Sequence, residues 1–238
     1  MSSATAEVIG AGARQYVREP MNLVLLLVLP PLFIVAMSSA ISTFSGVLGG
    51  NLGERAGAGL SGLWAASILT GVASFFLASA SARVDGRLVL AGLHPTSLTA
   101  AHVTATLTIA LVTTTVSVGI LLATQTVGRP EVLFAAILAA ALIYGFIGSL
   151  LSVYVRGDLE GSFVIILLFM LDAFVGGPLA AGEGVFAESL PLHSPSEISI
   201  AGMVDAPVKD SWVAWSGGYL LVLAAVAALA LSRRRVGG

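Results

Sequence analysis

The sequence predicts an all-α membrane protein with six transmembrane helices, and three observations support this. Apolar residues make up 57% of the 238-residue chain and charged residues only 10%, whereas a soluble domain carries about 25% charged residues. Mean hydropathy is +0.98. The apolar residues also gather in windows long enough for a helix of about 20 residues to cross the hydrocarbon core. These windows are approximately 21–43, 60–81, 100–123, 132–154, 162–181 and 212–231.

The same composition excludes several other classes of protein. So few charges do not cover the surface of a soluble enzyme, and a net charge of -2 leaves no positive surplus for nucleic acid. The absence of cysteine excludes disulfides and thiolate metal sites. The chain carries no phosphate-binding Gly-rich loop, and its three histidines lack metal-ligand spacing. We therefore expect no catalytic residue, metal or cofactor in this chain.

The distribution of Arg and Lys predicts the orientation. Of the 11 positive residues, eight lie in segments on one side of the predicted spans and three on the other. Because cytoplasmic loops are enriched in Arg and Lys, both termini are expected in the cytoplasm and the acidic 183–210 segment outside. The eight are Arg14, Arg18, Arg83, Arg87, Arg156, Arg233, Arg234 and Arg235, and the three are Arg55, Arg129 and Lys209.

Two segments outside the spans carry further patterns. Residues 1–20 place Arg14, Tyr16 and Arg18 ahead of the first span, which favours an interfacial helix over a frayed cytoplasmic tail. Residues 82–99 begin with charges, continue with leucines and end at Pro95, where a new helix is expected to start. This second segment is too short and too charged to span. We predict an amphipathic piece at the cytoplasmic surface that presents side chains to a partner.

Small and hydroxylated residues line two of the predicted spans. A face without bulk runs through the second span, and such faces allow helices to approach closely in lipid. We favour packing for this face, with a pathway lining left open because Thr70 and Ser74 add hydroxyls. The third span is rich in Thr, whose hydroxyls usually bond the carbonyl four residues earlier. A stripe that contacts substrate is the alternative there.

Asp172 is the one acid placed well inside a predicted span. A charge at that depth costs about 2.5–3.5 kcal/mol, so the carboxyl needs a partner, a polar cavity or a proton. Two interpretations stay open, a functional site and a hydrogen-bonded acid that locks helix packing. Gly176, Gly177 and Pro178 follow and should break the helix. We expect short, partly re-entrant helices to cap the outer side across 182–211.

The order of these parts resembles the ATP-binding-cassette type-2 permease family, the membrane subunits of ABC exporters. The N-terminal RQYVREPMNLVLLLVLPPLFIVAM (14–37) is similar to the family's interfacial elbow helix and proline-bearing first span. The stretch VDGRLVLAGLHPTSLTAAHV (84–103) is similar to its loop between spans two and three. The broken fifth span, the Pro-rich outer segment and the last span with its basic tail complete the resemblance, which covers the whole chain as one permease domain.

The resemblance implies a transport role driven by a separate ATPase subunit, on which ATP and magnesium would bind. It implies a coupling helix within 82–99 and a second cytoplasmic contact at 156–160. It also implies two permease cores side by side, as a homodimer or with a second permease, and a pathway between them. The coupling candidates are Arg83, Asp85, Gly86, Arg87, Leu90, His94, Pro95, Arg156, Asp158 and Glu160. The pathway or gate candidates are Thr70, Ser74, Asp172, Gly176, Gly177 and Pro178.

We therefore expect a permease subunit that exports an amphipathic or lipid-like substrate across the cell membrane of a prokaryote. Lipid is the surrounding medium, and no nucleic acid is expected as a partner. Two alternatives remain at this stage: a proton-linked secondary carrier that uses Asp172, and a membrane assembly factor without transport. Asp172 departs from the usual pattern of the family.

Overall fold

The computed structural model describes residues 20–47, 52–155, 157–179 and 185–236, and these residues contain helices and no strand. Six helices are long and apolar enough to cross a membrane, which confirms the predicted class. They are α2 (Pro20–Val47), α3 (Glu54–Leu90), α4 (Pro95–Thr124), α5 (Pro130–Tyr154), α6 (Asp158–Leu171) with the π-helical turn η1 (Asp172–Gly176), and α9 (Asp210–Val236). The predicted interfacial helix, with Arg14, Tyr16 and Arg18, lies outside the described residues.

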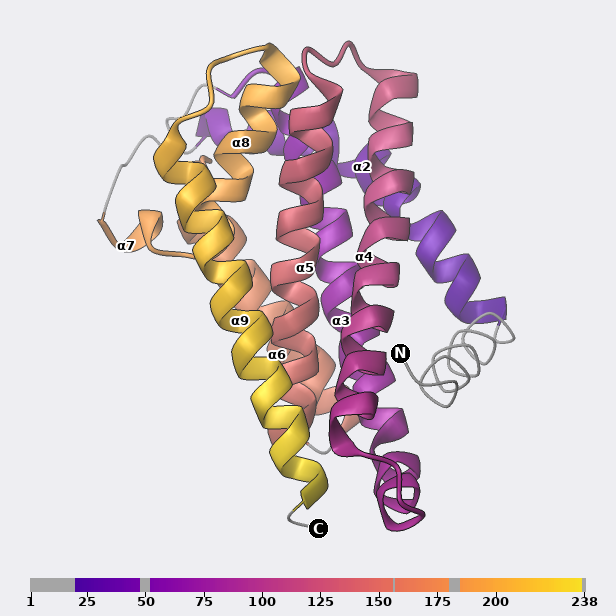
Figure 1. Ribbon diagram of the computed structural model, residues 1–238. Coiled ribbons are helices and arrows are strands. Elements are labelled where there is room, and N and C mark those ends of the chain that lie inside the picture. The colour runs from indigo at the N-terminus through magenta and orange to yellow at the C-terminus, as the bar shows by residue number, and fades with distance from the viewer. Residues whose placement is uncertain (1–19, 48–51, 156, 180–184, 237–238) are drawn as a thin grey trace.

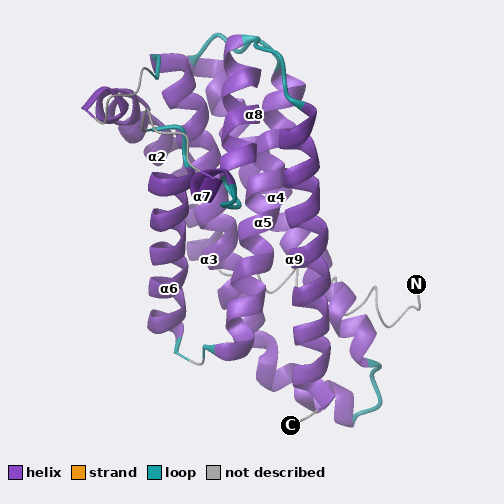
Figure 2. Cartoon of the chain, turned by 90° about the vertical axis from the view of Figure 1, so that its left-hand side faces the viewer, coloured by secondary structure: helices purple, strands orange, loops and turns teal. Residues whose placement is uncertain are grey.

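The long helices α3, α4, α5, α6 and α9 run side by side, and α2 crosses them obliquely (Figure 1). Figure 2 shows α6 at one edge of this bundle. The ends of α3, α5 and α9 and the starts of α4 and α6 share one end of the molecule, which we call the Arg87 end (Figure 1). The opposite end, where α5 begins, is the Arg129 end. The connections predicted to be cytoplasmic, among the described residues, therefore gather together.

Helix α5 is the centre of the bundle, and 67% of its span is buried. It crosses α3 so closely that a Cβ on Gly148 would collide with the backbone carbonyl of Gly71. Nearby, a Cβ on Gly145 would lie 3.0 Å from Cγ2 of Thr70. The small-residue face predicted on the second span thus packs closely against α5, as close approach in lipid requires.

The threonines of α4 mainly bond within their own helix, as predicted. Thr104, Thr108 and Thr115 donate to the carbonyls of Ala100, Thr104 and Leu111 at 2.7–2.9 Å. Thr113 also donates to its own helix, and its hydroxyl lies 2.9 Å from that of Thr70 on α3. These contacts satisfy the hydroxyls without any substrate.

The segment 82–99 differs from the predicted surface loop, because its first half simply continues α3 to Leu90. Nothing in 82–90 ends a helix. The chain turns at Gly92, which adopts a φ of 93° that favours glycine. There Leu93 N donates to Leu88 O and Gly92 N to Val89 O, the pairing of a Schellman motif. We call residues 83–99 the α3–α4 tip.

The second half of the tip agrees with the prediction that a helix begins at Pro95. His94 is the N-cap of α4, and its Nδ1 accepts a hydrogen bond from the Thr96 amide at 3.4 Å. Proline is favoured at the first helical position because its missing N–H would have no partner there. The tip is therefore a tight helical hairpin, which extends beyond the α5–α6 connection at the Arg87 end (Figure 1).

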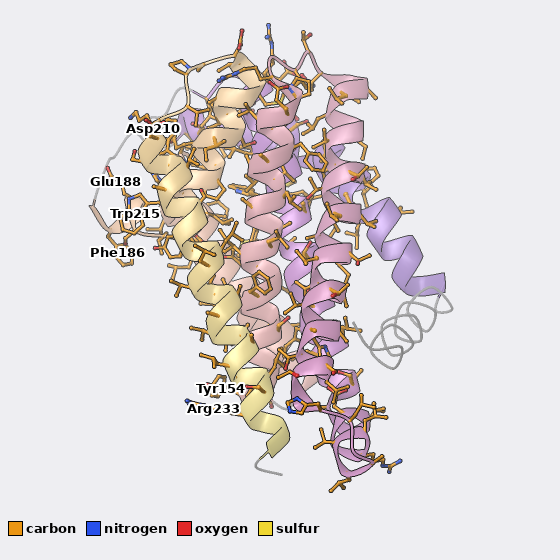
Figure 3. The ribbon with its side chains drawn as sticks, in the orientation of Figure 1. Tyr154, Phe186, Glu188, Asp210, Trp215 and Arg233 are labelled. Carbon is orange, nitrogen blue, oxygen red and sulfur yellow. The ribbon has the colours of Figure 1, made fainter. Side chains whose placement is uncertain are left out.

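The outer segment contains two helices, α7 (Val185–Glu188) and α8 (His193–Val204). α7 lies at the periphery, whereas α8 packs against α3, α5 and α9. Trp215 on α9 is exposed towards the Arg129 end, Phe186 on α7 is exposed close to mid-height, and Arg233 lies near the Arg87 end (Figure 3). Trp215 and Arg233 are 18 positions apart on α9, or about 27 Å at helical rise, close to the hydrocarbon thickness.

Candidate functional site

The candidate site is the place where the fifth described helix, α6, is interrupted inside the bundle. α6 passes into the π-helical turn η1, and Gly177 leaves it in an extended conformation with ψ of 155°. A side chain at Gly177 would collide with the carbonyl of Ala173, so glycine allows this exit. π-Helical turns are rare and occur often at functional sites. We call the contacts among η1, α5 and the start of α8 the junction.

Asp172 is the centre of the junction. Its side chain is buried, with 3% of the residue exposed. The Tyr144 hydroxyl of α5 donates to Oδ2 at 2.8 Å, and the Leu192 backbone N–H lies 3.1 Å from Oδ1 and 3.2 Å from Oδ2. Leu192 is the N-cap of α8, whose first N–H groups have no partner within the helix. The Asp172 carboxyl therefore satisfies one of these donors from a different helix.

The stabilisation is reciprocal, because α8 in turn satisfies the end of the interrupted helix. Nδ1 of His193 lies 2.9 Å from the Gly176 carbonyl oxygen, and since a carbonyl only accepts, this nitrogen carries the proton. The Ser45 hydroxyl of α2 donates to the Leu179 carbonyl at 3.0 Å just beyond the break. The interrupted end of α6 and the start of α8 thus supply hydrogen-bonding groups to each other, at a place where lipid could supply none.

Aromatic rings surround the junction. Phe169 lies edge-on to Tyr144 with ring centroids 5.6 Å apart, and edge-on to Trp64 at 6.1 Å. Trp64 also contacts Phe174 at 6.1 Å. These rings come from α3, α5, α6 and η1. The polar contacts of the junction are therefore surrounded by apolar side chains. Hydrogen bonds are stronger in such surroundings, and leaving one unmade costs more.

The far end of α8 is held by the α4–α5 connection. Backbone N–H groups of Gly128 and Arg129 donate to the carbonyls of Met203 at 3.1 Å and Gly202 at 2.8 Å. The Arg129 guanidinium also donates to the Ala206 carbonyl and lies 3.2 Å from Oδ1 of Asp205. Asp205 ends α8 in the left-handed conformation. α8 is therefore tied at both ends, to two different connections.

These contacts bear on the two interpretations of Asp172. The carboxyl is buried and hydrogen-bonded to two other segments of the bundle, as an acid that locks helix packing would be. The neighbouring candidates Gly176, Gly177 and Pro178 form the break itself. Thr70 and Ser74 are 0% and 1% exposed between α3, α4 and α5. Within one copy of the chain, neither hydroxyl faces an open path.

The predicted coupling residues lie at the Arg87 end, on the tip and at the start of α6. Arg87, Leu90 and His94 are exposed, as are Asp158 and Glu160. Gly86 is partly buried, and Arg83 and Pro95 are placed only by their backbone in α3 and α4. Arg156 lies outside the described residues. Asp85 differs from the expected contact residue, because it faces α4 and is only 7% exposed.

Sequence reasoning missed the partner of Asp85. Oδ2 of Asp85 lies 2.9 Å from Nε2 of His102 on α4, and the Ser81 hydroxyl lies 3.2 Å from the same nitrogen. A hydrolytic triad would use both ring nitrogens, one for the acid and one for the serine, so this cluster is not one. A turn recognised at Gly92 could have indicated this pair. Two antiparallel helices joined at Gly92 would bring Asp85 on the first helix opposite the region of His102 on the second.

Among the described residues, no three His, Asp or Glu side chains gather as a metal site would require. Comparisons of the sequence with protein-family models and with curated proteins give no match.

Proposed function

We propose that this chain is the permease subunit of an ATP-driven exporter of the ABC type, powered by a separate ATPase subunit. The α3–α4 tip is the observation that carries the proposal. The apolar part of α3 ends at Ala82, yet the helix continues to Leu90. Eight further residues add about 12 Å of helix. A rigid hairpin that leaves the membrane is a suitable lever for a partner that cannot enter it.

The side chains of the tip support a protein partner in water. Leu90 is 89% exposed and Val84 56% exposed, although this part of α3 lies beyond the apolar span. Leu159, at the start of α6 on the same end, is 87% exposed. Apolar side chains exposed outside the lipid often mark an interaction site. Arg87 adds a positive charge beside them.

The charge distribution supports a cytoplasmic position for this end. Five positive residues belong to the ends of helices at the Arg87 end: Arg83, Arg87, Arg233, Arg234 and Arg235. At the other end lie Glu54, Glu131, Asp205 and Asp210, with Arg55, Arg129 and Lys209. By the positive-inside rule, the tip faces the cytoplasm of a prokaryotic cell, where ATP is available. The junction and α8 then close the outer half.

The proposal includes a second permease core and an amphipathic or lipid-like substrate. α6 exposes several apolar side chains in a row along one face, among them Phe163, Leu167 and Leu171, all above 50% exposed. In the membrane such a face contacts lipid or a second copy of the chain. Asp172 is the one acid well inside the described spans, and its hydrogen bonds to Tyr144 and Leu192 leave it poorly placed to bind an ionic substrate.

The proton-linked carrier is less well supported by the geometry. A carrier's acid must exchange its proton with water, whereas Asp172 is 3% exposed and holds two donors. Replacing Asp172 by Asn separates the two functions. A proton-linked carrier would lose its dependence on a pH gradient, and an ATP-driven permease would retain ATP-dependent flux.

The direct test is purification of the chain from native membranes in mild detergent, followed by mass spectrometry. We expect a subunit with a Walker nucleotide-binding motif to co-purify. Arg87→Glu should remove that subunit, because it reverses a charge on the tip. Arg55→Glu is the matched control, an equal change at the exposed opposite end of the same helix. Purification without any nucleotide-binding subunit, or equal loss in both variants, would contradict the proposal.

A further inference from the structure

A buried polar cluster lies at the base of the α3–α4 tip, where the apolar part of α3 ends. It consists of Ser81 and Asp85 on α3 and His102 on α4. Asp85 is 7% and His102 8% exposed. Burial of two ionisable groups is costly unless they are paired and hydrogen-bonded. The position of the cluster therefore needs an explanation that helix packing alone does not supply.

The hydrogen-bond geometry assigns the proton on His102. The Ser81 hydroxyl donates to the Ala78 carbonyl at 3.3 Å, so its oxygen is left to accept. The Asp85 carboxylate accepts only. Nε2 of His102 lies within 3.2 Å of both oxygens, and it must therefore carry the proton and donate to them. The imidazole N–H of His102, on α4, thus joins two consecutive turns of α3.

We propose that His102 and Asp85 brace the α3–α4 tip, so that the hairpin moves as one body with the bundle. They are positioning residues, because the exposed end of the tip would touch the partner and the brace would carry its movement inward. The role of the brace in carrying movement from a partner rests on the proposed function. The hydrogen bonds that form the brace lie within this chain and do not depend on that function.

Several positions of the tip face open space. A Cβ added to Gly86 or to Gly92 would meet nothing within 4 Å. Val84, Leu90 and His94 are exposed. Leu98 is the buried apolar residue beside the cluster, at 1% exposed. Helical turns without tertiary packing are only marginally stable. A charge-assisted bond across the base therefore determines how stiffly the hairpin is held.

The first arm of the test measures amide hydrogen exchange of the full chain in nanodiscs. His102→Ala should accelerate exchange of the tip amides about ten- to a hundredfold, the effect of losing a hydrogen bond to a charged group. Thr113→Val is the matched control, because it removes a side-chain bond between α3 and α4 that lies inside the bundle. Asp85→Asn keeps an acceptor oxygen and should show a smaller acceleration in the same amides.

The second arm measures whether the tip still drives movement at α7, which lies far from the tip (Figure 1). Since the chain lacks cysteine, Phe186→Cys on the exposed α7 provides a single labelling site. In the complex with its ATPase subunit, ATP should change the rate of maleimide labelling at that site. His102→Ala should abolish this ATP-dependent change while the ATPase subunit stays bound. The double variant Asp85→His with His102→Asp, which swaps the two side chains, should restore it.

Unchanged exchange in the tip of His102→Ala, or the same acceleration in Thr113→Val, would overturn the brace. An ATP-dependent labelling change that persists in full in His102→Ala would overturn its role as a lever. If the unmodified chain captures no ATPase subunit, the proposed function fails. The exchange measurement on the chain alone then still decides whether the brace exists.

Discussion

The two halves of this bundle are held together by different means. Towards the Arg129 end, broken helices meet and side-chain and backbone hydrogen bonds connect them, with Asp172 at the centre. Towards the Arg87 end, continuous helices cross at close range, with Gly148 against Gly71. Polar contacts in the first half replace the hydrogen bonds that the break removes. In the second half no break exists, and the polar cluster at Asp85 connects two intact helices instead.

This difference indicates what each half can do. Close backbone packing leaves α3 and α5 little room to separate, so this half transmits movement as a block. The junction contains few, directional bonds whose loss would free the start of α8. An exporter of the proposed kind needs both properties: a rigid input at the tip and a separable closure on the outer side.

The largest expected effect comes from Asp172→Ala, which leaves the Tyr144 hydroxyl and the Leu192 N–H without their partner. Each unsatisfied buried donor costs about 1–3 kcal/mol, so the loss in stability should reach about 2–6 kcal/mol. Thermal unfolding in nanodiscs measures it. Asp158→Ala, at an exposed position on the same helix, should change stability little. An equal effect of both substitutions would contradict the role assigned to the junction.

Gly148→Ala tests the other half and should be the next most damaging. The added Cβ meets the Gly71 backbone, which cannot move without shifting α3 against α5, and overpacking typically costs about 1–3 kcal/mol. The control is Gly119→Ala on α4, where nothing lies within 4 Å and alanine should stabilise the helix by about 0.5–1 kcal/mol. In chemical unfolding, we expect the free energy of unfolding to fall in Gly148→Ala and to rise in Gly119→Ala.

Arg129→Ala should have a smaller and local effect, because it frees the outer end of α8 and leaves the junction intact. The ion pair to Asp205 is partly exposed and contributes about 0–1 kcal/mol, while the bond to the Ala206 carbonyl adds about 1 kcal/mol. Hydrogen exchange should accelerate in the last turn of α8 and stay unchanged at Leu192. Equal acceleration along all of α8 would show that its two ends are not held independently.

Thr115→Val should have the smallest effect, within about 0.5 kcal/mol of the unmodified protein. Its hydroxyl bonds only the Leu111 carbonyl on the exposed side of α4. A large loss of activity with intact stability would instead favour the substrate-contacting stripe.

Local features of this fold were readable from the sequence, and contacts between distant segments were not. The six spans follow from length and hydropathy, and the start of α4 follows from Pro95. The sequence prediction ends this helix too early, near the end of the apolar span. Hydropathy indicates which residues can lie in lipid, but it does not indicate where a helix ends. Leu90 ends that helix because Gly92 turns the chain.

The candidate site shows the same limit. Asp172 was recognisable as an acid in a span, but its partners Tyr144 and Leu192 lie 28 and 20 positions away on other segments. Hydrophobic periodicity carries no information about such pairing. The reciprocal bond from His193 to Gly176 arises only because η1 brings the two ends together.

The most direct test of the proposed function places a photo-activated cross-linker at Leu90, the 89% exposed residue at the end of the tip, in native membranes. The account predicts a cross-linked subunit that carries a Walker nucleotide-binding motif. The same probe at Leu221, 75% exposed on α9 within the apolar span, should capture no such subunit. A nucleotide-binding protein absent at Leu90, or captured equally from both positions, would contradict the account.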